Sequence, residues 1–157
     1  MLRLGRGRVA AGDGRKECNM TLAENKDIIR RYSDDLWGAG RLDLVEQLFA
    51  PDFVEHDPDP VPERPAGREG IKHDVLRIRK AFPDFAMNTD DIICEGDRVA
   101  LHWSARGTQT GDLIGIPATG RQVTMSGMQF FRIREGRIVE RWGVFDRIGV
   151  MRQLGVA

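Results

Sequence analysis

The chain has 157 residues, a length that suits one ordinary domain rather than two. Lysine plus arginine and aspartate plus glutamate are equal at 24 each, so no partner is implied by charge. The arginines are scattered among carboxylates instead of forming a basic stripe, which argues against nucleic-acid binding. No apolar run approaches the roughly 18 residues of a membrane span, so no membrane association is expected.

The first 19 residues differ in composition from the rest of the chain. Residues 1–19 are rich in glycine and arginine, so we expect a disordered leader before a domain spanning 20–157. Cys18 in this leader and Cys94 in a predicted strand are poorly placed for a disulfide, which fits a reducing compartment. The N-terminus also lacks the apolar core of a signal peptide, and a cytoplasmic protein is therefore expected.

Two helices are predicted to begin the domain. Thr21 followed by Glu24 forms a capping box, and apolar residues then recur at helical spacing to about Trp37. A second helix is indicated over 44–48, and we expect Pro51 to end it because proline cannot continue the hydrogen-bond ladder.

The remaining elements alternate between strand and helix signals. Residues 53–57 (FVEHD) predict a short strand and residues 67–82 a third helix. Further strands are predicted over 84–94, 98–108, 121–134 and 137–145, before a closing helix from about Arg147. The loop 110–120 contains apolar residues that are costly to leave in water, so we expect it to fold over something.

Three stretches of this sequence resemble a known family. They are FVEHDPDP, VALHWSARGTQTGDLIGIPATGRQV and FFRIREGRIVERWGVFDRIGVMRQLG, and they are similar to the SnoaL-like polyketide cyclases of the nuclear transport factor 2-like superfamily. The resemblance implies the α+β class: a cone-shaped, curved antiparallel (mixed) sheet that encloses a pocket together with three N-terminal helices. It also implies a homodimer or higher homo-oligomer.

The resemblance further implies an ester cyclase that uses neither a cofactor nor a metal. In the family, an intramolecular aldol condensation closes a ring of a polyketide ester, and an aspartate after the last strand is the acid/base. That residue corresponds to Asp146, and His56 resembles a polar group of the family pocket. The chain departs from some members because 121–134 contains no histidine, and Gln129 is the nearest polar candidate.

Strand alternation gives Asp146 a predicted environment. Trp142, Val144 and Asp146 project from one face of their strand. With regular pairing about the Glu135-Gly136 turn, Gln129 lies opposite Trp142 and Met125 opposite Asp146, and a bulge would shift this pairing by one residue. A carboxyl group among these side chains would be poorly solvated, which suits a proton shuttle.

Each candidate also has a purely structural interpretation. Asp146 precedes the last helix and is a suitable N-cap. His56 could be a satisfied histidine beside a turn, or a metal ligand with Asp57 and Asp59, although no second histidine has ligand spacing. We expect catalysis from Asp146 and His56, and contact with a small apolar or aromatic, polyketide-like ligand from Tyr32, Trp103, Met125, Gln129 and Trp142.

Two other functions remain open from the sequence. In a ketosteroid isomerase type of enzyme, an aspartate just after the second helix region removes a proton, and Asp57 is the candidate. Alternatively, the domain has no catalytic activity and either binds an apolar ligand or dimerises through the outer face of its sheet.

Overall fold

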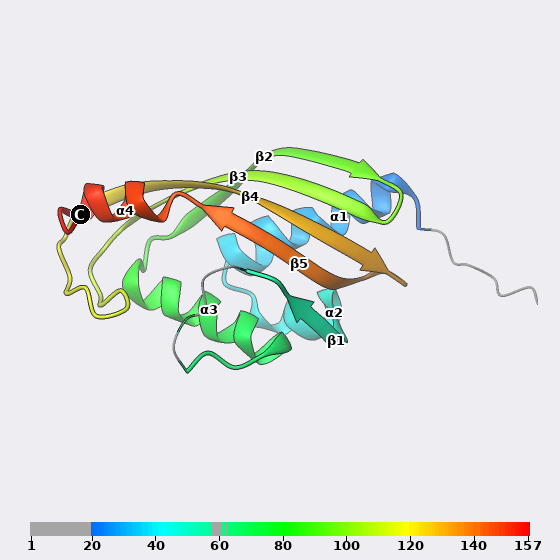
Figure 1. Cartoon of the computed structure of the whole chain (residues 1–157), viewed down its shortest axis with the longest axis horizontal. Coiled ribbons are helices and arrows are strands. Elements are labelled where there is room, and N and C mark those ends of the chain that lie inside the picture. The colour runs from blue at the N-terminus through cyan, green and yellow to red at the C-terminus, as the bar shows by residue number, and fades with distance from the viewer. Residues whose placement is uncertain (1–19, 58–60, 62) are drawn as a thin grey trace, which may run out of the picture.

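The computed structural model describes residues 20–157 except 58–60 and 62 (Figure 1). The expected leader and part of the proline-rich loop therefore lie outside the described residues. None of the helices in the described part of the chain is long and apolar enough to cross a membrane.

The N-terminal helices begin as the sequence predicts. The Thr21 hydroxyl accepts a hydrogen bond from the Glu24 N–H at 3.2 Å, and the Glu24 carboxylate accepts one from the Thr21 N–H at 2.7 Å, so the capping box starts α1 (Leu22–Arg30). The chain continues through a π-helical segment, η1 (Arg31–Gly38), and a 3₁₀ turn, η2 (Leu42–Leu44). A single turn of α-helix, α2 (Val45–Leu48), follows directly.

The prediction that Pro51 ends the second helix is wrong. That helix ends at Leu48, and Pro51 lies inside the first strand, β1 (Phe49–Glu55). The register between β1 and β5 shifts between Phe49 and Val54, so the missing proline N–H falls in an interrupted part of the ladder.

A mixed sheet of five strands forms the body of the domain, in the order β1-β5-β4-β3-β2. The other strands are β2 (Ala86–Glu95), β3 (Arg98–Thr108), β4 (Gln122–Arg134) and β5 (Arg137–Phe145). β1 pairs with β5 in parallel and the remaining neighbours are antiparallel. The helices α1 and α3 (Gly67–Ala81) lie on one side of the curved sheet, and α4 (Arg147–Leu154) lies at its end (Figure 1). The expected α+β cone is confirmed.

One face of the sheet builds the core. In β3 the side chains alternate, since Val99, Leu101, Trp103 and Ala105 are buried while His102 is exposed. These side chains face helices α1 and α3, which bury their own apolar stripes against them.

The predicted register between β4 and β5 requires a correction. A register shift between Arg132 and Ile133 moves the pairing by one residue, so Gln129 lies opposite Gly143. Trp142 lies opposite Phe130 instead, on the face of the sheet turned away from the core. The turn itself forms as expected, with Arg134 opposite Arg137, so the error comes from the bulge alone.

Candidate functional site

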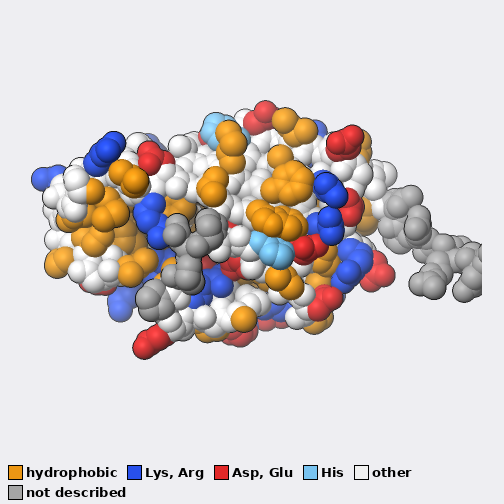
Figure 2. All heavy atoms as spheres, viewed as in Figure 1, with side chains coloured by type: hydrophobic (Ala, Val, Ile, Leu, Met, Phe, Trp, Pro, Cys, Tyr) orange, Lys and Arg blue, Asp and Glu red, His pale blue; other side chains and the backbone are white. Residues whose placement is uncertain are grey.

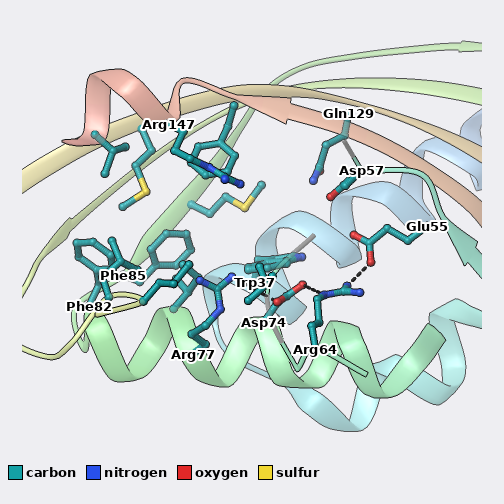
Figure 3. Close-up of a pocket in the computed structure, with 18 of the residues that line it drawn as sticks. Trp37, Glu55, Asp57, Arg64, Asp74, Arg77, Phe82, Phe85, Gln129 and Arg147 are labelled. Carbon is teal, nitrogen blue, oxygen red and sulfur yellow. Dashed lines mark hydrogen bonds and ion pairs between the residues drawn. The ribbon is translucent and has the colours of Figure 1, made fainter. Parts of the chain in front are cut away.

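A cavity of about 610 Å³ lies between the inner face of the sheet and helices α3 and α4 (Figure 3). Its apolar wall includes Phe82, Phe85, Met87, Trp103, Met125 and Phe145. The loop between β3 and β4 adds Leu113, Ile114 and Ile116, which confirms that this loop folds over an apolar space. The volume and apolar character suit a small organic ligand.

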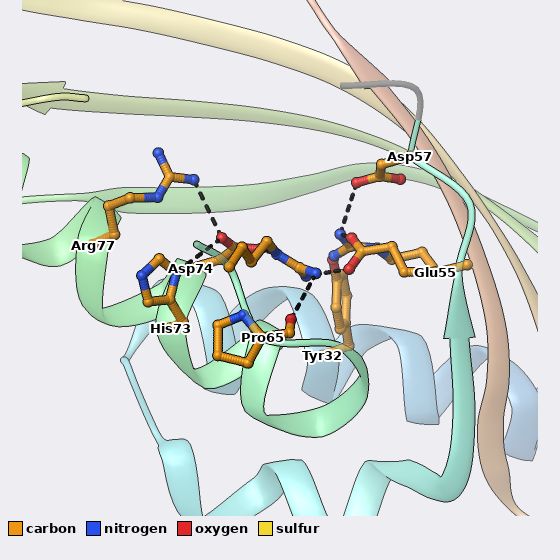
Figure 4. Close-up of polar contacts among 9 residues, drawn as sticks. Tyr32, Glu55, Asp57, Pro65, His73, Asp74 and Arg77 are labelled. Carbon is orange, nitrogen blue, oxygen red and sulfur yellow. Dashed lines mark hydrogen bonds and ion pairs between the residues drawn. The ribbon is translucent and has the colours of Figure 1, made fainter. Parts of the chain in front are cut away.

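Charged side chains line the opposite side of this chamber. Phe53 is buried from β1, and alternation along that strand turns Glu55 toward the same interior. Asp57, two residues further on, also lines the chamber and lies near Glu55 (Figure 4). Arg141 of β5 pairs with both carboxylates. Two carboxylates and one guanidinium thus define a polar end.

Arg141 is the centre of this polar end. One of its terminal nitrogens donates a hydrogen bond to the Tyr32 hydroxyl at 2.8 Å, and the other pairs with Glu55 and with Oδ2 of Asp57 at 2.9 Å. Because Arg141 is only 3% exposed, these partners compensate its charge.

A second arginine connects this cluster to helix α3. Arg64 pairs with Glu55, and its Nε donates a hydrogen bond to Oδ2 of Asp74 at 2.7 Å. Asp74 is nearly buried and also accepts a hydrogen bond from Arg77 at 3.3 Å (Figure 4). The network therefore joins β1, β5, α3 and the loop that precedes α3.

The Tyr32 phenol is buried at the bottom of the polar end. Burial raises its pKa above the ordinary value of 10.0, and the effect of burial outweighs Arg141, whose positive charge and hydrogen bond act in the opposite direction. Tyr32 is therefore a neutral hydroxyl at physiological pH, and its oxygen accepts the hydrogen bond from Arg141.

Gly143 leaves room for the side chains of Asp57 and Gln129 to lie close to the strand backbone. A β-carbon at Gly143 would lie 3.1 Å from Oδ1 of Asp57 and 3.2 Å from Cγ of Gln129, so both side chains occupy the space that a larger residue would fill. Figure 3 shows the two side chains together at one end of the chamber. The glycine is thus required for a close approach rather than for its backbone conformation.

Several polar atoms of the chamber have no hydrogen-bond partner among the described residues. They include the indole nitrogens of Trp37 and Trp103 and Oε1 of Gln129, all inaccessible to solvent. A buried polar group without a partner is costly, and such groups at the wall of a chamber are suited to bind polar atoms of a ligand. The wall therefore offers two donors and one acceptor within an apolar surface.

Four predicted site residues line the chamber, namely Tyr32, Trp103, Met125 and Gln129. Asp146 is not one of the lining residues. It is exposed, and its carboxylate accepts a hydrogen bond from the Gly149 N–H at 2.8 Å as the N-cap of α4. The poorly solvated environment expected for Asp146 is therefore wrong, because the bulge in the β4–β5 pairing turns Trp142 and Val144 outward.

His56 and Trp142 lie together on the outer face of the sheet. Their rings stack with centroids 4.4 Å apart and planes inclined by 10°, and Nε2 of His56 lies 3.0 Å from Oε2 of Glu140. Phe130 contacts Trp142 edge to face, and hydrophobic side chains and a histidine gather on this surface in Figure 2. The structure thus separates these two predicted residues from the chamber.

Sequence reasoning missed the charged residues that organise the chamber. Glu55, Arg64 and Arg141 were not singled out, since charged side chains usually remain in solvent. The sequence nevertheless contained a signal for Glu55. It lies two residues after the apolar Phe53, and residues two apart in a strand project from the same face. Trp37, at the end of the first helical segment, was also missed as a wall residue.

Fold and site together define a class of protein, namely the cone-shaped α+β domains that enclose a chamber for a small ligand. The model of the SnoaL-like polyketide cyclase family matches residues 26–154, and the chain belongs to this family.

Relatives of this chain include named cyclases. It is 28% identical over 136 residues to the aklanonic acid methyl ester cyclase DauD from Streptomyces sp. (strain C5), a match that covers 82% of this chain and 80% of DauD. The structure is similar to TsrD from Streptomyces laurentii, with a TM-score of 0.78, 25% identity, and coverage of 88% of this chain and 99% of TsrD. It is also similar to IdmH from Streptomyces antibioticus, with a TM-score of 0.73, 36% identity, and coverage of 84% and 99%.

Proposed function

We propose that the chamber closes a ring of a polyketide-like ester by an intramolecular aldol condensation, with a carboxylate as acid/base and without a cofactor. The observation that carries this proposal is the position of Asp57. Its carboxylate lines the chamber between Arg141 and Gln129, beside an apolar space large enough for an organic ligand. Relatives whose names describe ester cyclases support the same reaction class.

The proposed reaction needs one proton acceptor and nearby hydrogen-bond donors. Asp57 accepts the α-proton of a 1,3-dicarbonyl unit, and the C–H electron pair becomes an enolate. The α-carbon then attacks a ketone carbon of the same molecule, a C–C bond forms, and the ketone oxygen takes the proton back from Asp57. The indole N–H groups of Trp37 and Trp103, which have no partner within the described part of the chain, are suited to stabilise the oxygen charge that develops.

This proposal moves the acid/base role from Asp146 to Asp57. Asp146 is exposed and its carboxylate caps a helix, whereas Asp57 faces the chamber with a side chain that is 31% exposed. A proton acceptor must lie within hydrogen-bond reach of its substrate, and the place of Asp57 in the chamber wall supports this role. His56, on the outer face, has no part in the proposed reaction.

Proton exchange tests the proposal directly. A β-keto ester is incubated in heavy water with the native protein or a variant, and α-deuteration is followed by NMR. We expect Asp57→Asn to lower the exchange rate at least about 100-fold, because a general base usually contributes a factor of this size. His56→Gln and Asp146→Asn are matched controls outside the chamber, and both should retain the native rate.

The outcomes separate the possible roles. Loss of exchange in Asp146→Asn with full activity in Asp57→Asn would return the acid/base role to Asp146. No acceleration by the folded native protein would contradict the proposal and leave a binding function.

The position of Asp57 also favours a second candidate, proton transfer of the ketosteroid isomerase type. That reaction would begin with the same proton removal but move a double bond without forming a new C–C bond. Product analysis distinguishes the two, since ring closure changes the carbon skeleton of a linear polyketide ester and isomerisation leaves it intact.

A further inference from the structure

The loop between β3 and β4 is organised around one buried amide, that of Gln109. This side chain is fully buried and does not line the chamber. Its Nε2 contacts three carbonyl oxygens of the loop, at 3.2 Å from Gly111, 3.0 Å from Ile116 and 3.2 Å from Pro117. Its Oε1 accepts hydrogen bonds from the N–H and the hydroxyl of Thr119, at 3.1 and 2.7 Å.

The same loop is also attached to helix α3. The N–H groups of Thr110 and Gly111 both donate to the Ala81 carbonyl, at 3.0 and 3.1 Å. Gly111 packs so closely on α3 that a β-carbon there would collide with the Lys80 carbonyl oxygen. Two independent sets of contacts therefore fix the loop, one inside it and one to the helix.

What the loop presents to the chamber is entirely apolar. Leu113, Ile114 and Ile116 line the cavity, and a backbone bridge between Leu113 and Ile116 shapes the tip. Gln109 donates directly to the Ile116 carbonyl, so the position of this wall depends on the amide. No other described polar side chain contacts the loop backbone at as many points as Gln109 does.

We infer that Gln109 is a positioning residue, which determines ligand affinity by holding the Leu113–Ile116 wall over the apolar part of the chamber. The inference deepens the proposed function, because it concerns how the same chamber binds its substrate. Gln109 acts through the loop and contacts neither Asp57 nor Arg141, so it should govern binding and not proton transfer.

Binding of a neutral apolar fluorophore, N-phenyl-1-naphthylamine, tests this inference without any reaction. Gln109→Leu replaces the amide with an apolar side chain of similar size and removes all the amide contacts. We expect it to weaken binding about tenfold, which corresponds to ~1.4 kcal/mol. Gly111→Ala moves the loop away from α3 without removing a buried polar group, and it should weaken binding in the same direction.

A destabilised control separates positioning from a general loss of structure. Asn25 is also buried, and its side chain donates to the Gly96 carbonyl at 3.0 Å, in a part of the fold that does not line the chamber. Asn25→Leu should lower stability but leave the affinity for the fluorophore unchanged. Equal loss of affinity in Asn25→Leu, or native affinity in a folded Gln109→Leu, would overturn the inference.

A kinetic readout complements the binding assay. In the α-deuteration reaction, Gln109→Leu should raise KM while kcat stays near the native value, since the proton acceptor lies at the other end of the chamber. A fall in kcat with unchanged KM would contradict a positioning role. If the native protein shows no exchange, the proposed function fails, and the fluorophore titrations still decide the inference.

Discussion

At the scale of single residues, Tyr32 gives the polar end a measurable pH response. Its pKa is raised by burial, so its contribution to stability is fully present below pH 10.0, the ordinary value, and is lost as the pH rises through the raised value. Tyr32 is the only tyrosine of the chain, so phenolate absorbance reports this group alone. We expect ionisation only together with unfolding.

The matched variant for this prediction is Tyr32→Phe. Without the phenol, its free energy of unfolding in urea should fall less than that of the native protein between about pH 8 and pH 11, a range that includes the ordinary tyrosine pKa. A phenolate signal that appears in the folded native protein near pH 10 would show that Tyr32 is not shielded as the structure indicates.

Asp146 allows capping to be separated from catalysis. Asp146→Ala removes the side chain that accepts from the Gly149 N–H and should lower the free energy of unfolding by about 1 kcal/mol. Asp146→Asn keeps a capping oxygen and should be nearly as stable as the native protein. Denaturant unfolding of both variants measures the difference, and equal stability of all three proteins would argue against the cap.

At the scale of elements, the two arginines near Glu55 bind separate parts of the chain together. Glu55→Ala leaves the buried Arg141 and the nearly buried Arg64 with fewer compensating charges, and we expect a loss of about 3 kcal/mol. Asp27→Ala is the contrasting control, because the Arg30–Asp27 pair is exposed and contributes below about 1 kcal/mol. Chemical denaturation compares them, and similar losses would contradict the structural importance of Glu55.

Local sequence signals predicted where the elements lie along the chain. They predicted only in part which side chains of each strand point toward the core. β3 and β5 begin and end where alternation and turn residues predict, and Trp103 projects inward as expected. His56 lies two residues after the exposed Val54, so the alternation of side chains along β1 favours an outward position for His56 as well. The sequence of the Glu135-Gly136 turn does not encode the bulge beyond it, and Trp142 was therefore assigned to the wrong face.

The charged end of the chamber was harder to predict for a different reason. Arg141 is buried, and Arg64 nearly so, because carboxylates from two distant parts of the chain, Glu55 with Asp57 and Asp74 on α3, converge on them. Such long-range compensation depends on tertiary structure, while single-sequence reasoning places an unpaired arginine in solvent.

At the scale of the whole molecule, the outer face of the sheet offers an apolar surface. Met128 and Val144 are each 63% exposed there, and Phe130 packs beside them against Trp142. Self-association through this surface stays a prediction from the family resemblance. If it occurs, Met128→Glu should shift the protein toward monomer in sedimentation experiments, whereas Leu76→Glu, at an exposed position on α3, should not.

The register shift between Arg132 and Ile133 decides which side chains of β5 reach the chamber. Ile133 pairs with Ile138 and Arg132 with Glu140, so Val139 is the extra residue of a bulge in β5. If the same sequence paired without this bulge, Trp142 would lie opposite Gln129 and the Arg141 guanidinium would leave the chamber. One extra residue therefore decides whether β5 presents a positive charge or an indole to the ligand.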